Sequence, residues 1–376
     1  RISKALDNGE TIGIHGDYDV DGITGTALLE RFLRELVGKT VSYLPHRQKE
    51  GYGMKPSGVE ELHRQGASLL ISVDCGINDH EAVDRARQLN MDVIIVDHHQ
   101  VPETLPNACA IINPQLPACP YNGEDLSGVG VAFYLCIALR AHLRNTGRTK
   151  NGPNLKSYLD LVALGTIADV VPITGLNRVL VHFGLSELAD SRRPGIIQLK
   201  RVSGVNAGPV GVGQVGFRLA PRLNATGRLD SADLALSLLL ADNEREAGII
   251  ADKLEQLNRT RQSVEERILE EADKALGVME GGTLAPGLAV AGEGWHVGVI
   301  GIVASRLTET YYRPSAVIGV HDGVGRGSLR SIPGVNIYKV LERCSDMLEV
   351  FGGHPSAAGL TIKEKMVPRF LEFFPE

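Results

Sequence analysis

The sequence predicts an α/β protein in which an N-terminal domain with a parallel sheet is joined by a long helix to a smaller α/β domain. Three observations carry this prediction: apolar runs alternate with helical patterns, one long amphipathic pattern follows, and the alternation then resumes. The chain has 376 residues, of which 43% are apolar, and this is enough for two or three domains. We expect domains at 1–242 and 278–376, connected by a helix at 243–277.

Short apolar runs predict the strands of the first domain. They lie at residues 11–14, 41–44, 69–73 and 93–96. Helical patterns separate these runs, at residues 23–36, 56–65 and 78–89. Strands that alternate with helices in this way are typical of a parallel sheet. The chain from 127 to 190 is then predicted to be mainly helical.

The connecting helix is predicted from apolar residues that are spaced by threes and fours between 243 and 277. A glycine-rich break from Gly277 to Gly287 follows it. The second domain is then predicted to have strands at 288–291, 315–319 and 360–362, and helices at 298–309 and 336–346.

Composition and charge exclude several classes of protein. The net charge of −6 argues against a broad basic surface for nucleic acid. The sequence has neither a run of 18 apolar residues nor a signal-peptide layout, so we expect no membrane span and a cytoplasmic location. The five cysteines form no C-x-x-C pair, which favours reduced, structural thiols. Because the chain begins at Arg1, we expect a fragment of a longer protein.

Acidic and histidine residues gather where predicted strands and helices end. The clusters are His15-Gly16-Asp17-Tyr18-Asp19-Val20-Asp21-Gly22, Asp74-Cys75-Gly76, Asp97-His98-His99 and Asp169. The carboxyl ends of parallel strands open on one crevice, so we expect these clusters to meet. Packed carboxylates and imidazoles destabilise one another unless a cation compensates them, and oxygen-rich ligands suit Mn²⁺ or Mg²⁺. A single Asp in such a place is more often a helix cap, so the prediction depends on all four clusters together.

The triplet Asp97-His98-His99 is the signature of the DHH phosphoesterase superfamily, and the chain resembles the RecJ exonucleases within it. The resemblance covers nearly the whole chain. Its ordered motifs are residues 13–25, Asp74, 97–99, 165–172, 216–228 and 352–359. It implies a DHH catalytic domain, a DHHA1 substrate-binding domain, and an active site in the cleft between them.

The resemblance also implies two metal ions, Mn²⁺ or Mg²⁺, with named ligands. His15 and Asp19 are the implied ligands of one ion, and Asp21, His98 and Asp169 those of the other. Asp74 is implied to bridge the ions, and Asp17 is either a further ligand or a residue behind the ligands. His99 is implied to face the scissile phosphate or to hold the site, and Asp97 to orient a histidine.

Substrate selection has to come from outside the metal site, because two metal ions act on almost any phosphoester. Three segments are candidates for binding phosphate: Arg47 with residues 50–53, a loop that carries Arg218, Arg222 and Arg228, and the glycine-rich segment 325–330 beside residues 352–354. Glycine-rich backbone with arginine suits a phosphate cradle, although such segments are also found as solvated loops and tight turns. The expected substrate-binding residues are Arg47, Tyr52, Arg222, Arg228, Ser328, Arg330 and His354. Trp295 either stacks on a base or belongs to the core. Aromatic residues make up only 5% of the chain, so we expect binding through phosphates and shape.

The function that the resemblance implies is 5′→3′ hydrolysis of single-stranded DNA to mononucleotides in DNA repair and recombination, by two-metal activation of water. The expected partners are single-stranded DNA with a 5′ end and a helicase and single-strand-binding protein that supply it, and the protein is expected to be a monomer. The alternatives are a DHH–DHHA1 phosphodiesterase of short oligonucleotides or cyclic dinucleotides, a phosphatase of nucleotide bisphosphates, and an inactive scaffold that binds nucleic acid. The helical stretch 113–230 favours the RecJ type, and the presence of every implied ligand argues against the scaffold.

Overall fold

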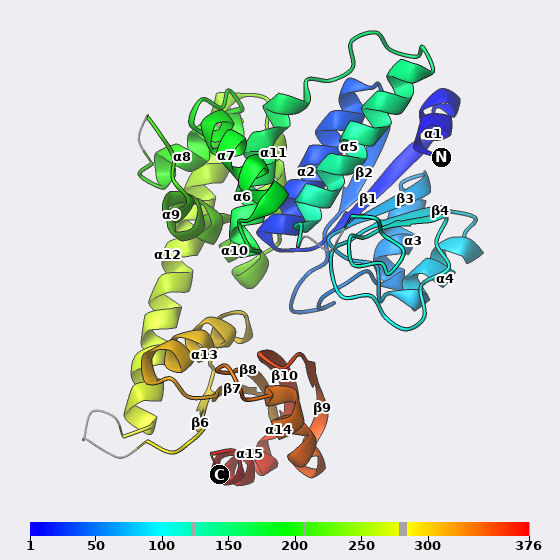
Figure 1. Cartoon of the computed structure of the whole chain (residues 1–376). Coiled ribbons are helices and arrows are strands. Elements are labelled where there is room, and N and C mark those ends of the chain that lie inside the picture. The colour runs from blue at the N-terminus through cyan, green and yellow to red at the C-terminus, as the bar shows by residue number, and fades with distance from the viewer. Residues whose placement is uncertain (122–124, 206–207, 278–283, 376) are drawn as a thin grey trace. The chain divides into compact units, whose positions relative to one another are not determined.

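The computed structural model describes residues 1–121, 125–205, 208–277 and 284–375, and it divides into two compact units. Unit 1 comprises Arg1–Asn258 and unit 2 comprises Arg259–Glu376. Each unit contains one five-stranded sheet (Figure 1). The predicted α/β class is therefore confirmed, whereas the predicted cleft between the domains stays a prediction.

The sheet of unit 1 is parallel throughout, with the strand order β2-β1-β3-β4-β5. Its strands are β1 (Thr11–Gly16), β2 (Lys39–Tyr43), β3 (Ala67–Val73), β4 (Asp92–Val96) and β5 (Ala110–Ile112). The sequence predicts the first four and misses β5, whose three residues are too few to show a pattern. Strand order reverses between β1 and β3, and the carboxyl ends of these two strands form the switch point at which such sheets bind ligands.

Helices cover both faces of this sheet (Figure 1), because successive strand residues point to opposite faces. Ile71 and Val73 of β3 belong to a large core with helices α2 (Val20–Glu35) and α5 (Gly128–Asn145). Leu70 lies on the other face, in a smaller core with α3 (Pro56–Arg64) and α4 (His80–Gln88). Apolar side chains of β3 therefore pack on both faces of the sheet, as is usual for a central parallel strand.

The chain from residue 128 to 240 is largely helical and completes the large core, as predicted for 127–190. Its helices are α5, α6 (Leu159–Ala168), α7 (Gly175–Ala189), α8 (Pro194–Val202), α9 (Val212–Gln214), the π-helical turn η2 (Val215–Leu219), α10 (Ala220–Leu229) and α11 (Asp233–Leu240). The arginine-bearing segment 217–228 was expected to be a loop and is helical instead. It is helical because Leu219 and Leu223 are buried at a helical spacing.

Helix α12 (Glu244–Ala275) occupies the place of the predicted connecting helix. Ala251 and Leu254 in its first half belong to the core of unit 1. In its second half, the Oε2 atom of Glu271 accepts a hydrogen bond of 2.5 Å from Nε1 of Trp295 in unit 2. The boundary between the compact units therefore falls inside α12 and not at its ends.

Unit 2 has a mixed sheet with the strand order β6-β7-β8-β10-β9. Its elements are β6 (Leu288–Glu293), α13 (Val297–Tyr311), β7 (Ser315–His321), β8 (Val324–Arg330), α14 (Ile337–Arg343), β9 (Leu348–Gly353), β10 (Ala357–Lys363) and α15 (Val367–Phe373). Strands β6 and β7 are parallel, and the other pairs are antiparallel. Most of the glycine-rich break predicted from Gly277 to Gly287 lies outside the described residues.

One expectation for unit 2 is corrected, and of the two alternatives for Trp295 the structure favours the core. Segment 325–330, expected as a glycine-rich phosphate cradle, is a strand paired on both sides, so its backbone N–H groups belong to the sheet. Gly327 is needed there for packing, because a Cβ atom would lie 2.8 Å from Cγ of Leu360. Trp295 is a core residue and no stacking platform, since only 2% of it is exposed. In the described part of the chain, no helix is long and apolar enough to cross a membrane.

Candidate metal and catalytic centre

The first acidic cluster directly follows strand β1 and therefore lies at the switch point of the sheet. Asp19 caps α2, where its Oδ1 atom accepts hydrogen bonds from the backbone N–H groups of Asp21 (2.9 Å) and Gly22 (3.2 Å). Gly22 lets the chain turn tightly, because a Cβ atom would lie 2.5 Å from the backbone nitrogen of Asp17. The cap and the tight turn hold the carboxylates of Asp17, Asp19 and Asp21 close together at one strand end.

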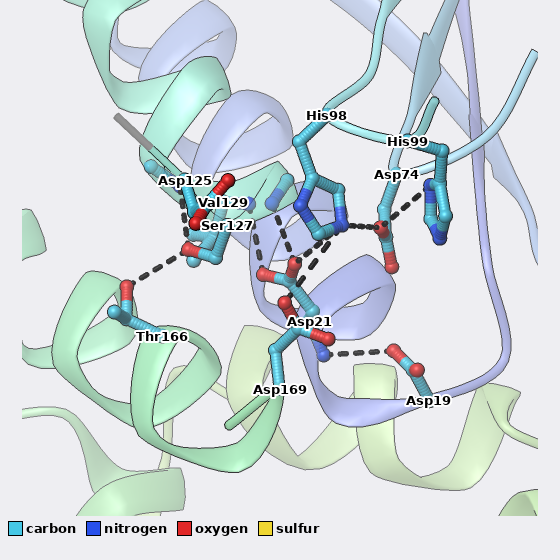
Figure 2. A network of polar contacts seen from close by, with 12 residues as sticks. Asp19, Asp21, Asp74, His98, His99, Asp125, Ser127, Val129, Thr166 and Asp169 are labelled. Atoms are coloured by element: carbon cyan, nitrogen blue, oxygen red, sulfur yellow. Dashed lines mark hydrogen bonds and ion pairs between the residues drawn. The ribbon is translucent and has the colours of Figure 1, made fainter. Parts of the chain in front are cut away.

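Asp74 directly follows strand β3, at the same switch point of the sheet. Asp74 has a φ angle of +62°, and its backbone nitrogen donates a hydrogen bond to the carbonyl of Val96 in the neighbouring strand (2.9 Å). The left-handed backbone region is uncommon outside glycine, but Asp is one of the residues that tolerates it best. This conformation ends the strand abruptly and brings a buried carboxylate to the centre of the site (Figure 2).

The loop after β4 is organised by Asp97. Its Oδ1 atom accepts hydrogen bonds from the backbone nitrogen of His98 (2.8 Å) and from Nδ1 of His99 (2.7 Å), and its Oδ2 atom accepts one from the backbone of Ile77 (3.0 Å). Burial opposes the ionisation of Asp97, but the bond to His99 lowers its pKa. Burial likewise opposes protonation of His99, whereas Asp97 raises the pKa of His99. Asp97 therefore orients the histidine, in the role that the sequence analysis implied.

Three overlapping sets of side chains have ligand atoms within 4.8 Å of one another, among the residues that the structure describes. The sets are Asp21, His98 and Asp169; Asp74, His98 and His99; and Asp17, Asp19 and Asp74. Nε2 of His98 lies 3.0 Å from Oδ1 of Asp74 and 3.8 Å from Oδ2 of both Asp21 and Asp169 (Figure 2). Asp74 and His98 each belong to two sets, so the sets form one continuous centre.

Several atoms of this centre are buried without a hydrogen-bond partner: Oδ1 of Asp17, Oδ1 of Asp74, Nε2 of His98 and Oδ2 of Asp169. Burial raises the pKa of Asp17, Asp21 and Asp74 well above their ordinary values and that of Asp169 to about 6. It lowers the pKa of His98 to about 4. Such a cluster is costly unless cations compensate it, and its oxygen-rich donors fit Mn²⁺ or Mg²⁺.

His15 belongs to none of the three sets of the described chain, so its implied role as a ligand stays a prediction. Its Nε2 atom is, like the atoms named above, buried without a hydrogen-bond partner. It is fully buried, with its ring 5.2 Å from that of Tyr43 and its Nδ1 atom 3.8 Å from Sγ of Cys75. Burial lowers its pKa to about 4. The sequence left two roles open for Asp17, and its carboxylate lies beside those of Asp19 and Asp74.

The expected substrate residues of unit 1 fall into two groups. The hydroxyl of Tyr52 lies 3.2 Å from the backbone oxygen of Asp74. The guanidinium of Arg47 lies over the ring of Tyr18, 5.0 Å from its centroid, and Tyr18 is the residue between Asp17 and Asp19 in the sequence. Arg228 is tied to the same loop, because its carbonyl accepts a hydrogen bond of 3.0 Å from Gln48. These residues border the acidic centre.

Arg222 belongs to the second group. Its Nε atom forms an ion pair of 2.7 Å with Oε2 of Glu255, and both side chains are largely buried. Its Nη1 atom donates a hydrogen bond of 2.6 Å to the carbonyl of Arg218. Arg222 thus connects α10 to α12, and the substrate-binding role expected of it stays a prediction.

The expected residues of unit 2 meet at one end of its sheet. Nη1 of Arg330 donates to the backbone oxygen of Leu329 (2.8 Å) and to Oγ of Ser328 (3.2 Å). The sheet register pairs Arg330 with Ala357, and the carbonyl of Ala357 accepts a hydrogen bond of 2.8 Å from the backbone of His354. A Cβ atom at Gly301 of α13 would lie 3.0 Å from Oγ of Ser328 and 3.5 Å from Nη2 of Arg330, so the side chains of Ser328 and Arg330 lie beside that helix.

The sequence analysis missed the segment 126–129, which precedes and begins α5. Its backbone N–H groups bind the carboxylate of Asp21, and Ser127 caps the helix by accepting a hydrogen bond of 3.2 Å from Gly130. A serine followed by an apolar helical pattern is a cap signal in the sequence. The signal finds the helix start but does not show that a buried aspartate lies against it.

The comparisons with known proteins agree with this geometry. The DHH family, N-terminal domain, matches residues 11–166, and the DHHA1 domain matches residues 285–376. Single-stranded-DNA-specific exonuclease RecJ of Escherichia coli (strain K12) is 44% identical over 100% of this chain and 67% of its own length. The protein with the same description from Bacillus subtilis (strain 168) is 41% identical over 98% of this chain. The match covers only 45% of the length of the B. subtilis protein.

Solved structures extend the comparison to the fold. RecJ from Thermus thermophilus in complex with Mn²⁺ has a TM-score of 0.86 and 34% identity, and the match covers 100% of this chain and 53% of that one. Another structure, exonuclease RecJ bound to manganese, has a TM-score of 0.85 and 37% identity, and the match covers 100% of this chain and 91% of that one. The Thermus protein was also solved with Mg²⁺, and matches with a TM-score of 0.78.

The two domains, in this order and with this acidic and histidine centre, place the chain among the metal-dependent hydrolases of the DHH–DHHA1 class. Its identity to the E. coli and B. subtilis proteins runs over both domains and the helix between them. The chain belongs to the RecJ family of single-stranded-DNA-specific exonucleases.

Proposed function

We propose that this chain is the catalytic part of an exonuclease that hydrolyses single-stranded DNA from its 5′ end and releases mononucleotides. The observation that carries the proposal is the continuous centre in which Asp74 and His98 are each shared between two sets of ligand atoms. Two ions about 3.5–4 Å apart need a shared carboxylate and several terminal ligands, and this centre offers both. The descriptions of the RecJ relatives, named above, supply the substrate class.

The proposed ligands follow from the three sets and not from the sequence motif alone. One ion is assigned to Asp17, Asp19 and Asp74, and the other to Asp21, His98 and Asp169, with Asp74 as the bridge. His15 then packs behind the ligands. When bound, the ions activate a water molecule and neutralise charge on the scissile phosphate.

The remaining chemistry belongs to His99 and Asp97. Because Asp97 accepts a hydrogen bond of 2.7 Å from Nδ1–H and raises the pKa of His99, the ring is able to carry a second proton on Nε2. We assign that proton to a phosphate oxygen of the substrate. The fixed tautomer and orientation of His99 are the contribution of Asp97.

DNA is proposed to bind mainly through its phosphates. Ser328, Arg330 and His354 of unit 2 offer a hydroxyl, a guanidinium and an imidazole at one end of a sheet beside α13, and these groups suit a terminal 5′-phosphate. Arg47 and Arg228 of unit 1 border the acidic centre and suit the phosphates next to the scissile bond.

We further propose that the protein acts as a monomer in the cytoplasm, in DNA repair and recombination, on strands supplied by a helicase and a single-strand-binding protein. Unwinding costs about 1.4 kcal/mol for each base-pair step. The sequence has no G-x-x-x-x-G-K-[S/T] nucleotide-binding motif that would drive it. Separate strands are therefore the expected substrate.

The test is incubation with Mn²⁺ and single strands labelled at either end, with and without a 5′-phosphate. The expected result is immediate release of the 5′ label as a mononucleotide, while a blunt duplex is resistant. Asp74→Asn, which suits the left-handed backbone of that position, is expected to abolish hydrolysis while the protein stays folded. Asp92→Asn at the exposed start of β4 is the control. Release that begins at the 3′ end, or full activity of Asp74→Asn, would contradict the proposal.

A further inference from the structure

Two proposed ligands of one ion are held from behind by the segment 126–129. Both carboxylate oxygens of Asp21 accept hydrogen bonds from it: Oδ2 from the backbone nitrogen of Gly128 at 2.5 Å and Oδ1 from that of Val129 at 2.9 Å (Figure 2). The backbone of Leu126 takes part in a hydrogen bond with His98. Bonds of this kind from behind a ligand fix its direction and its basicity.

The third ligand is connected to the same segment through two side-chain hydroxyls. Oγ of Ser127 lies 2.9 Å from Oγ1 of Thr166 on α6, and both residues are fully buried. Thr166 precedes Asp169 by three residues, so the two lie on one face of the last turn of α6. Figure 2 shows this connection, which runs from Asp21 through the start of α5 and across the hydroxyl pair to the end of α6.

We propose that the Ser127–Thr166 hydroxyl pair is a positioning device that fixes Asp21 relative to Asp169 and thereby sets the affinity and the ion preference of the site formed with His98. The proposal rests on the metal centre described under Proposed function. Ser127 and Thr166 are positioning residues, because they act through Asp21 and Asp169 and touch no substrate.

The two candidate ions are expected to respond differently to a loss of this bond. Mg²⁺ demands near-ideal octahedral geometry with ligands at about 2.0–2.1 Å, and it gives up its water molecules reluctantly. Mn²⁺ binds the same oxygen and imidazole donors, and imidazole suits transition ions better than Mg²⁺. A small increase in the freedom of Asp21 relative to Asp169 should therefore weaken the binding of Mg²⁺ more than that of Mn²⁺.

The experiment measures equilibrium binding of Mn²⁺ and of Mg²⁺ to the full chain by calorimetry, with the spectrum of bound Mn²⁺ as a second readout. Thr166→Val keeps the side-chain volume and removes the hydroxyl. It is expected to weaken Mn²⁺ binding at the affected site by about tenfold or more, the usual effect of removing a group behind a ligand, and Mg²⁺ binding by a larger factor. Thr166→Ser, which keeps the hydroxyl, should restore wild-type binding of both ions.

The matched control is Thr26→Val. Thr26 is also a fully buried threonine, but its hydroxyl bonds to the carbonyl of Gly22 in its own helix (2.8 Å). It should leave the ratio of Mg²⁺ to Mn²⁺ affinity unchanged. The double variant Ser127→Ala/Thr166→Val leaves neither hydroxyl unpaired, and it tests the proposal even where the single variant folds poorly. Because Ser127→Ala also removes the cap at Gly130, the double variant is compared with both single variants in a double-mutant cycle, which separates the hydroxyl pair from the cap.

The possible outcomes distinguish an error in the metal centre from an error in the positioning role of the hydroxyl pair. If wild-type protein binds neither ion, or if Asp169→Asn binds both as the wild type does, the metal centre itself is wrong. If the wild type binds but folded Thr166→Val or the double variant keeps both affinities, the centre stands and the positioning role is overturned. If the affinities for Mg²⁺ and Mn²⁺ fall by the same factor, and Thr26→Val shows the same fall, the cause is a general loss of stability. This result would also overturn the positioning role.

Discussion

The hydroxyl of Tyr52 lies 3.0 Å from Nδ1 of His99 and 3.2 Å from the backbone oxygen of Asp74. One phenol thus contacts the histidine proposed to face the phosphate and the backbone of the proposed bridging carboxylate. Burial, together with the charges of Asp97 and Asp74, raises the pKa of Tyr52, so the phenol keeps the proton that it donates to the backbone oxygen of Asp74 at neutral pH.

Tyr52→Phe is accordingly expected to lower kcat by about tenfold, the equivalent of one hydrogen bond of roughly 1.4 kcal/mol, with little change in KM. The ring remains and only the orientation of His99 and Asp74 is loosened. Steady-state kinetics on a single-stranded oligonucleotide measures this, with Tyr312→Phe at an exposed position as the control. A rise in KM at constant kcat would make Tyr52 a substrate contact, as the sequence analysis expected.

Stabilisation by metal is expected to increase with pH. Burial raises the pKa of Asp169 from its ordinary 3.8 to about 6, so the metal-free folded state holds this proton more tightly than the unfolded state does. Its contribution to stability is complete below pH 3.8 and is lost as the pH rises through about 6. Mn²⁺ binds the deprotonated carboxylates, so the metal compensates for the repulsion that appears over this range.

The measurement is the shift in Tm on adding Mn²⁺ between about pH 5 and pH 8, which should grow with pH. In Asp169→Asn the metal-free protein should lose less stability over the same interval, because no carboxylate is left at that position. A shift in Tm that is equal at both ends of the range would speak against a centre of buried, proton-binding carboxylates.

Arg330→Ala is expected to raise KM at least about tenfold, since a charge-assisted bond to phosphate is worth roughly 1.5–3 kcal/mol. The preference for a 5′-phosphate should fall, and the difference from wild type should shrink as salt rises, because wild-type binding loses its gain from counterion release. Arg326→Ala, on the same face of β8 but four residues away, is the control. An equal loss of kcat on dinucleotides and long strands would instead place Arg330 in the catalytic centre.

Arg222→Ala is expected to destabilise the fold and to leave DNA binding unchanged. The change leaves Glu255, whose side chain is 17% exposed, without this ion pair, at a cost of about 1–3 kcal/mol. Thermal unfolding and a filter-binding assay on the same sample separate the two effects. Arg228→Ala on the same helix should show the opposite result, with weaker DNA binding and an unchanged Tm. Weak DNA binding by a stable Arg222→Ala would restore the expected substrate role.

The sequence predicts the fold of unit 1 well because its parallel strands are buried on both faces and read as continuous apolar runs. It predicts unit 2 less well. The alternate glycines of β8 look like a phosphate-binding loop, yet they make room for Leu360 and Ile362 of the neighbouring strand. Which neighbours a glycine faces depends on strand pairing between distant segments, and the local sequence does not contain this information.

The candidate site divides in a similar way. The strand-end rule brings Asp21, Asp74 and His98 together from the sequence alone, whereas Asp169 lies at the end of helix α6 and is not covered by that rule. The place of Asp17 beside Asp19 and Asp74 depends on the tight turn at Gly22, which the sequence motif does not reveal, whereas the ligand role of His15 stays a prediction. Ser127 and Thr166 are 39 positions apart, so their contact is evident only after α5 and α6 have packed.

The division of α12 between the units limits how the protein can be dissected. A fragment that stops at residue 242 would lose Ala251 and Leu254 and expose the core that they cover in unit 1. A fragment that starts at 278 would leave Trp295 without its bond to Glu271. Proteolysis or expression aimed at the ends of this helix should therefore yield unstable pieces, whereas a cut near its middle, after residue 258, leaves each piece with the half-helix that completes it.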